Sequence, residues 1–182
     1  MKTLIILKGL VKKRKLDWVK EQGLDLFFID YNIIRNLYSA PELLTSDRGV
    51  LNFSFSDIVY KRFIEIVCFR MSKGCLIVLD IENLSYNTIE GLAVIFGYNV
   101  FWVIDEIPKD YLRNAKDYVD SLYPIKSKLE LKKDILNYNN SIDRLNPDRI
   151  ITKYSQVVDF WNKRTVDVNT THLNTKSTTI HV

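Results

Sequence analysis

Apolar and polar positions along the chain fall into two kinds of segment. Short, nearly continuous apolar runs are typical of buried parallel strands, and they occupy Lys2–Leu7, Leu24–Ile29, Cys75–Asp80 and Asn99–Ile104. The segments between and after these runs have helical spacing, and the predicted helices are Val11–Gln22, Asn32–Ser39, Ser56–Met71, Ser85–Phe96 and Lys109–Asp120. Strands that alternate with helices indicate right-handed crossovers. The pattern therefore predicts an α/β protein whose parallel sheet carries helices on both faces.

The predicted helix Ser56–Met71 is strongly apolar, and we expect it to pack against the sheet. Six of its apolar side chains support this expectation: Ile58, Val59, Phe63, Ile66, Val67 and Phe69. In such a sheet, ligands bind beyond the carboxyl ends of the strands. Gly9, Asp30 and Asp80 all lie at such ends.

The C-terminal part of the chain has a different pattern. Leu129–Asn139 and Ser155–Lys163 are predicted helices, with a short strand at Arg149–Lys153 between them. From Thr165 onward the chain is rich in Thr and Asn and has few large apolar residues. We therefore expect one domain at residues 1–164 and a polar tail at residues 165–182, extended or docked on a protein partner.

Composition limits the classes of protein that need to be considered. The 182 residues are 47% hydrophobic, which suffices for one compact domain with a core. No apolar run is long enough to span a membrane and no signal peptide opens the chain, so we expect a cytoplasmic protein without a membrane partner. Cys68 and Cys75 lack metal-site spacing and are interpreted as small buried hydrophobic residues in a reducing cytosol. The net charge of +4 permits nucleic-acid binding without requiring it.

The segment after the first strand partly matches the phosphate-binding pattern G-x-x-x-x-G-K-[ST]. Gly9 takes the position of the first glycine and Lys15 that of the lysine, whereas Arg14 replaces the second glycine and Leu16 replaces the hydroxyl residue. In working loops the glycines let backbone N–H groups approach phosphate, the lysine neutralises the outer phosphates, and the hydroxyl binds Mg²⁺. Leu16 cannot bind a metal, while Arg14 could hold an anion only with a different geometry. The alternative interpretation is a solvated basic turn that matches by chance.

Four consecutive cations cluster where the first helix should begin: Lys12, Lys13, Arg14 and Lys15. Cations at a helix N-terminus oppose the macrodipole, at a cost of roughly 0.3–1 kcal/mol each. Bound phosphate, from a nucleotide or from a nucleic-acid backbone, would reverse that cost. This favours retained anion binding, and the alternative is a surface cluster whose small cost is tolerated.

These segments together resemble the kinase domain of phage-type polynucleotide kinases, a branch of the P-loop kinases. The loop is followed by Trp18, and Phe28–Arg35 resembles the family's strand with its R-D-D-x-x-R motif. Leu76–Leu84 resembles the V-D-x-T-N-L motif, and Arg113-Asn114 resembles the R-N that opens the lid. The resemblance covers about residues 1–140 and implies a P-loop kinase-like sheet, and a phage protein in the host cytoplasm.

The resemblance also implies roles for single residues. Asn32 takes the position of the aspartate that accepts the proton of the 5′-hydroxyl, and an amide cannot accept it. Arg35 retains the last arginine of that motif, whereas Tyr31 replaces the first. Asp30, a carboxylate two residues before Asn32, would replace the base only if the register slipped.

A further aspartate and the lid complete the implied site. Asp80 takes the position of the carboxylate that holds Mg²⁺, although a strand-end aspartate can simply cap the next turn. Arg113 is expected to contact phosphate, and Lys116 replaces the second lid arginine in charge but not in its forked geometry. ATP and Mg²⁺ are expected as cofactors only if the chain is active.

Three hypotheses follow. The favoured one is a pseudokinase that binds nucleic-acid ends, nucleotide phosphate or a partner protein, because the second glycine, the hydroxyl and the base are all replaced. The second is an active ATP-dependent 5′-hydroxyl kinase of nucleic-acid repair that uses Lys15, Asp80, Arg35 and Asp30. The third is a structural subunit that docks on a larger phage assembly through its polar tail.

Overall fold

The computed structural model describes residues 2–38, 56–81, 86–114 and 127–174. They belong to two compact units, Met1–Ile150 and Ile151–Val182. The first unit contains the following elements in chain order: β1 (Thr3–Lys8), α1 (Lys12–Glu21), the 3-10 turn η1 (Asp25–Phe27), β2 (Phe28–Asp30), α2 (Tyr31–Tyr38), α4 (Ser56–Ser72), β3 (Ile77–Asp80), α5 (Asn87–Phe96), β4 (Asn99–Ile104), α6 (Lys128–Ile142) and the 3-10 turn η3 (Pro147–Arg149). The second unit contains α7 (Ser155–Asn174).

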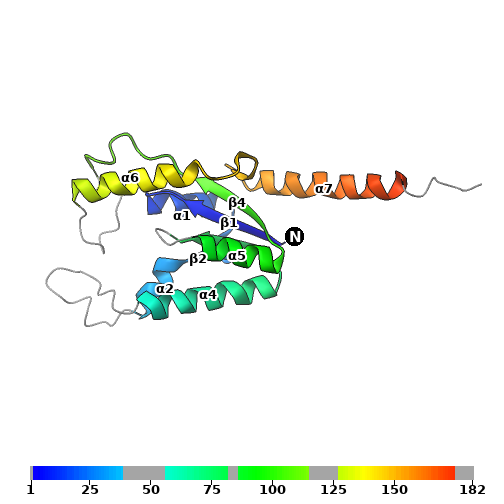
Figure 1. The fold of residues 1–182 in the computed structure, drawn as a ribbon, viewed down its shortest axis with the longest axis horizontal. Helices are drawn as coiled ribbons and strands as arrows, with labels where there is room; N and C mark the ends of the chain where they lie inside the picture. Colours follow the sequence, from blue (N-terminus) through cyan, green and yellow to red (C-terminus); the bar gives the residue numbers. More distant parts are fainter. Residues whose placement is uncertain (1, 39–55, 82–85, 115–126, 175–182) are drawn as a thin grey trace, which may run out of the picture. The chain divides into compact units, whose positions relative to one another are not determined.

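The four strands form one parallel sheet in the order β2-β3-β1-β4. β1 lies inside the sheet, paired to β3 on one side and to β4 on the other. Because β1 is covered on both faces, all of Leu4–Leu7 is at most 2% exposed. Figure 1 shows α4 and α5 on one side of the sheet and α1 on the other. The predicted α/β fold with a covered parallel sheet is therefore confirmed.

The main core lies between the sheet and the helices α4 and α5. Leu4 and Ile6 of β1 belong to the same apolar cluster as Val59, Phe63 and Val67 of α4. The expectation that α4 packs against the sheet is confirmed, and it does so through Val59, Phe63 and Val67. Ile58, Ile66 and Phe69 lie off this face and are 51%, 39% and 64% exposed. The reason is geometric, because a helix on a sheet buries one stripe with i, i+4 spacing, here positions 59, 63 and 67.

Three predicted strands differ from expectation, and the first of them is β3, which begins at Ile77, two residues after the predicted start at Cys75. The predicted strand Leu24–Ile29 begins with η1, so that β2 contains only Phe28–Asp30. The chain leaves α1 through Gly23 at a φ of 65°, and the 3-10 turn then aims it into the sheet. The predicted strand Arg149–Lys153 is replaced by η3 and a single bridge between Trp102 and Ile150.

Three further expectations need correction. Residues 109–114 of the predicted helix Lys109–Asp120 form turns, in which Tyr111 and Arg113 donate three residues back, and residues 115–120 lie outside the described part. Helix α7 continues to Asn174, so the backbone of the predicted tail is helical rather than extended over 165–174; residues 175–182 lie outside the described part. Cys75 is exposed and precedes β3, and Cys68 is only half-buried.

Within the described residues, no helix is both long and apolar enough to cross a membrane.

Candidate functional site

Three carboxylates lie at the carboxyl edge of the sheet, where α/β proteins place their ligand sites. Asp30 and Asp80 end β2 and β3 and are register partners on these neighbouring strands. Asp105 directly follows β4, and its N–H donates to the carbonyl of Lys8 at 2.8 Å. The loop Gly9–Val11 and the first turn of α1 extend from β1 at the same edge. The loop and the cations of the first turn of α1 therefore lie at the same edge of the sheet as these three carboxylates.

The lysine of the loop is buried against one of these carboxylates. Lys15 Nζ lies 2.6 Å from Asp80 Oδ1, and the two side chains are 5% and 1% exposed. The residue expected to contact outer phosphates thus faces the residue expected to hold Mg²⁺. Both charged groups are removed from water, which is costly. Their charge-assisted hydrogen bond to each other offsets that cost and so permits their burial.

A second ion pair joins the same helix to the neighbouring strand. Lys12 Nζ lies 3.3 Å from Asp30 Oδ2, and the Asp30 side chain is 1% exposed. Asp30 Oδ1 accepts the N–H of Asn32 at 2.8 Å, so Asp30 caps the first turn of α2. Asn32 itself is 2% exposed. The position expected to hold the catalytic base therefore belongs to a buried helix start.

The third carboxylate lies against the loop itself. A Cβ on Gly9 would come within 2.7 Å of Asp105 Cβ, so only glycine fits at that position. Arg14 Nη1 lies 3.3 Å from Asp105 Oδ1 and donates to the carbonyl of Glu106 at 3.1 Å. Burial raises the pKa of Asp105, and the neighbouring cations Arg14 and Lys15 oppose that shift. Asp105 is thus an internal anion that contacts the first glycine and the arginine of the loop.

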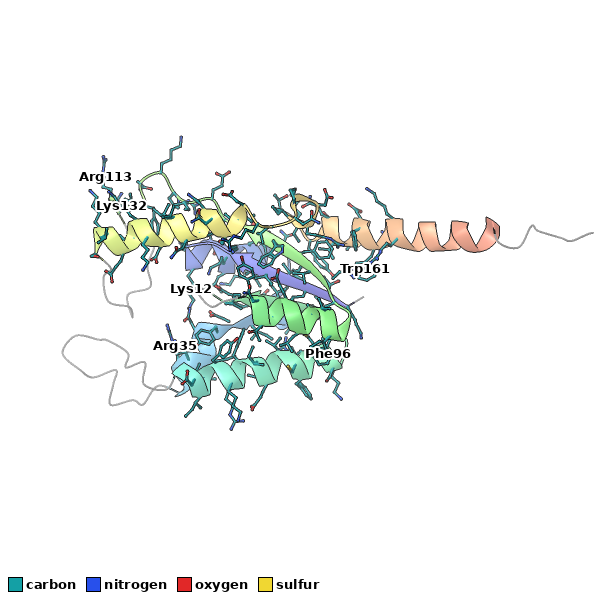
Figure 2. The ribbon with its side chains drawn as sticks, viewed as in Figure 1. Lys12, Arg35, Phe96, Arg113, Lys132 and Trp161 are labelled. Atoms are coloured by element: carbon teal, nitrogen blue, oxygen red, sulfur yellow. The ribbon has the colours of Figure 1, made fainter. Side chains whose placement is uncertain are left out.

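The other expected site residues are not gathered here. Lys13 is exposed on α1, Arg35 is half-buried on α2, and Arg113 is exposed in the turn after β4. In Figure 2, Arg35 and Arg113 lie in well-separated places, Arg35 beside α2 and Arg113 beside the start of α6. The structure therefore joins Lys15 to Asp80, Lys12 to Asp30 and Arg14 to Asp105, but brings neither Arg35 nor Arg113 into these pairs.

Sequence reasoning missed Asp105, although the rule that selected Asp30 and Asp80 also selects the residue after Asn99–Ile104. It also missed Tyr138 of α6, whose hydroxyl donates to the carbonyl of Asp105 and lies 3.3 Å from the carbonyl of Lys8. No sequence signal identifies Tyr138, because α6 reaches this edge only through the fold.

Lys8 lines a cavity of about 260 Å³ beside the loop. Its Nζ lies 4.2 Å from the ring centroid of Tyr86 and 5.6 Å from that of Trp102. Burial lowers the pKa of Lys8 to about 8, and the charge of Glu90 acts in the opposite direction. The aromatic faces stabilise the ammonium group only partly.

The loop does not fit a magnesium–nucleotide complex in this arrangement. Leu16 offers no oxygen, Asp80 is held by Lys15, and Asp105 lies against Gly9. Within the described residues, no group of three or more His, Cys, Asp or Glu side chains could hold a metal ion. We therefore derive no reaction step through such a complex.

No protein-family model matches the chain, and no curated protein matches it. Among solved structures, it is similar to a protein described as a "putative kinase" from Chloroflexus aurantiacus, with 15% identity and a TM-score of 0.52 over 72% of this chain and 77% of the other. A second similar structure is from the PezAT chromosomal toxin-antitoxin system of Streptococcus pneumoniae, with 14% identity and a TM-score of 0.43 over 86% of this chain and 60% of the other. The chain thus spans less than two thirds of that second protein. The first likeness supports the predicted P-loop kinase-like fold.

Proposed function

We propose that this chain is a polynucleotide-kinase-like pseudokinase, a protein that retains the P-loop kinase-like fold, has lost phosphoryl transfer and binds nucleic acid through its phosphates. The observation that carries the proposal is the internal neutralisation of the loop. Lys12, Arg14 and Lys15 are each held by one carboxylate, Asp30, Asp105 and Asp80 respectively. A phosphate at the loop would have to displace these carboxylates.

The same arrangement supports the proposed loss of transfer. Phosphoryl transfer depends on positioned cations and a metal ion that stabilise the charge of the transferred group. Here three of the four loop cations, Lys12, Arg14 and Lys15, are paired with carboxylates of the protein, and Leu16 stands at the position of the metal-binding hydroxyl. Asn32 cannot accept a proton, and its backbone is fixed to Asp30.

The test has two measurements on the natural protein. The first is transfer of the labelled γ-phosphate from ATP and Mg²⁺ to a 5′-hydroxyl oligonucleotide, compared with Lys15→Ala. The second is binding of the same oligonucleotide at low and high salt, followed by fluorescence anisotropy. We expect no transfer from either protein and binding that weakens steeply with salt. Transfer that Lys15→Ala abolishes would refute the proposal.

One observation favours a second candidate, an active 5′-kinase. Asp30 is a carboxylate next to Asp80 in the sheet, and it would serve as the base in place of Asn32 once released from Lys12. In that case Asp30→Asn would abolish transfer while oligonucleotide binding persisted. The matched control is Asp25→Asn, an exposed aspartate that begins η1 on the approach to the same strand.

A further inference from the structure

Uncommitted cations gather on a surface beside the neutralised loop. We name it the cationic ridge; its members are Lys109, Arg113, Lys128 and Lys132. Each of these side chains is exposed. Lys109, Arg113 and Lys128 line a depression of about 460 Å³ between the turn after β4 and the start of α6. Lys132 follows Lys128 by one helical turn, and Figure 2 shows it on the same end of α6 as Arg113.

The charges of the ridge are available to a partner. Within the described residues, none of the four cations lies within ion-pair distance of a carboxylate. Two carboxylates lie among these cations: Asp110 lines the same depression and accepts from Asn114 at 3.0 Å, and Glu130 accepts the N–H of Ser127 at 2.7 Å. Both donors are neutral, so both carboxylates keep their negative charge. The four cations outnumber the two carboxylates, so the ridge is positive on balance.

The ridge rests on a packed platform. Val11 of the loop, Tyr111 of the turn and Leu131 of α6 are at most 4% exposed and form one apolar cluster. The capping box of Ser127 and Glu130 fixes the first turn of α6. Lys128 and Lys132 lie about 6 Å apart along the helix axis, and a nucleic-acid strand rises about 3.4 Å per phosphate. The two lysines can thus contact phosphates that are one or two nucleotides apart.

We propose that nucleic acid binds to this protein through the cationic ridge and not through the loop. The proposal rests on the proposed function and specifies its binding surface. The sugar–phosphate backbone contacts Lys109, Arg113, Lys128 and Lys132, while Lys12, Arg14 and Lys15 keep their carboxylate partners. Such contacts position a strand without reading its sequence.

The experiment measures anisotropy of a 3′-labelled single-stranded oligonucleotide from 50 to 200 mM salt, with a duplex of the same sequence as a second arm. The ridge variant is Lys128→Gln with Lys132→Gln. Each lost phosphate contact should lower the affinity about fivefold near 0.1 M salt and the salt slope by about 0.7. We therefore expect a loss of about 25-fold and a slope smaller by about 1.4.

Two variants serve as controls, and thermal melting checks that each protein is folded. Lys13→Gln removes an exposed loop cation that belongs to none of the three carboxylate pairs, and Lys61→Gln removes an exposed cation on α4. Both should bind as the natural protein does.

Three results would contradict the proposal that nucleic acid binds to the cationic ridge. A loss with Lys13→Gln and none with the ridge variant would place binding at the loop and leave the proposed function intact. Failure of the natural protein to bind either oligonucleotide would refute the proposed function and the ridge together. The third result is that polyglutamate displaces the labelled oligonucleotide as well as an unlabelled oligonucleotide of the same charge does. That result would indicate an acidic protein as the partner of the ridge.

Discussion

At the scale of single residues, the ion pair of Lys15 and Asp80 has the largest predicted energetic effect. Lys15→Met leaves the Asp80 carboxylate buried without this cation, so we expect the free energy of unfolding to fall by about 3–5 kcal/mol. Urea unfolding measures it. The matched control is Lys13→Met, an exposed neighbour whose loss should change stability by no more than about 0.5 kcal/mol.

The double variant Lys15→Met with Asp80→Leu separates the lost pair from the lost packing. Because both charges are then removed, most of the stability should return. A double variant as unstable as the single one would contradict the assignment of the effect to an uncompensated charge.

The lowered pKa of Lys8 predicts a pH dependence of stability. The pKa of Lys8 is about 8 in the folded protein, whereas its ordinary value, which applies to the unfolded chain, is 10.5. Between pH 8 and pH 10.5 the unfolded chain therefore binds more protons than the folded protein. Stability from this residue should therefore rise as pH increases from about 8 towards 10.5, and the cost of its burial is fully present below pH 8. Lys8→Met should flatten the curve of unfolding free energy against pH between 8 and 9.5. An unchanged slope would show that another group titrates there.

At the scale of elements, the start of α6 depends on one capping residue. Ser127 accepts the N–H of Glu130 at 3.3 Å, and the Glu130 carboxylate accepts the N–H of Ser127. Ser127→Ala should cost about 1 kcal/mol, which lowers the melting temperature of a chain of this size by about 2–4 °C. Ser127→Thr keeps an acceptor at the cap and should melt close to the natural protein. Equal losses in both variants would argue against the cap.

The contact between the loop and the end of β4 predicts a gain of binding. Asp105→Asn removes the negative charge beside Gly9 and Arg14, so the loop should bind inorganic triphosphate about tenfold more tightly. Isothermal titration calorimetry measures the affinity. Glu106→Gln is the matched control, because it makes the same charge change at the next, exposed residue. Equal gains in both variants would indicate net charge as the cause.

At the scale of the whole molecule, the fold should accept a loop that matches the phosphate-binding pattern in full. Arg14→Gly with Leu16→Ser restores the phosphate-binding pattern and frees Asp105, at a helix cost of about 1 kcal/mol for the glycine. Saturating ATP and Mg²⁺ should then raise the melting temperature by about 5–10 °C. The natural protein should show no shift, and chelation of Mg²⁺ should reduce the shift of the variant. A shift in the natural protein would mean that its loop binds nucleotide as it stands.

Most of the fold could be predicted, because buried segments have recognisable local patterns of apolar residues. The β1 and β4 strands lie within one residue of their predicted bounds, since runs covered on both faces are continuously apolar. β2 was predicted too long, because Leu24, Leu26 and Phe27 are apolar but belong to the turn before the strand, where Leu26 is 85% exposed. Apolar content alone does not distinguish a strand from a turn that leads into it, so the sequence could not separate these two roles.

The site was harder to predict, since it depends on which side chains meet. Gly9, Lys15 and Asp80 were selected from the sequence, and all three lie at the expected edge of the sheet. The lysine and the aspartate were assigned to different ligands, however, whereas the structure pairs them with each other. A pattern of residue types shows which charged side chains are present, but it does not show which cation pairs with which carboxylate.

The sequence by itself determined the α/β class, the carboxyl edge as the place of the candidate site, and the departure of Arg14 and Leu16 from the phosphate-binding pattern. These features depend on local periodicity and on the chemistry of single residues. Only the tertiary structure decided that Lys12, Arg14 and Lys15 are paired with Asp30, Asp105 and Asp80, which lie at the ends of three different strands. Only the tertiary structure brings Lys109, Arg113 and Lys128 of the cationic ridge to one depression. The physical reason is that electrostatic interaction falls with distance in space, and distances between residues far apart in sequence exist only once the chain has folded.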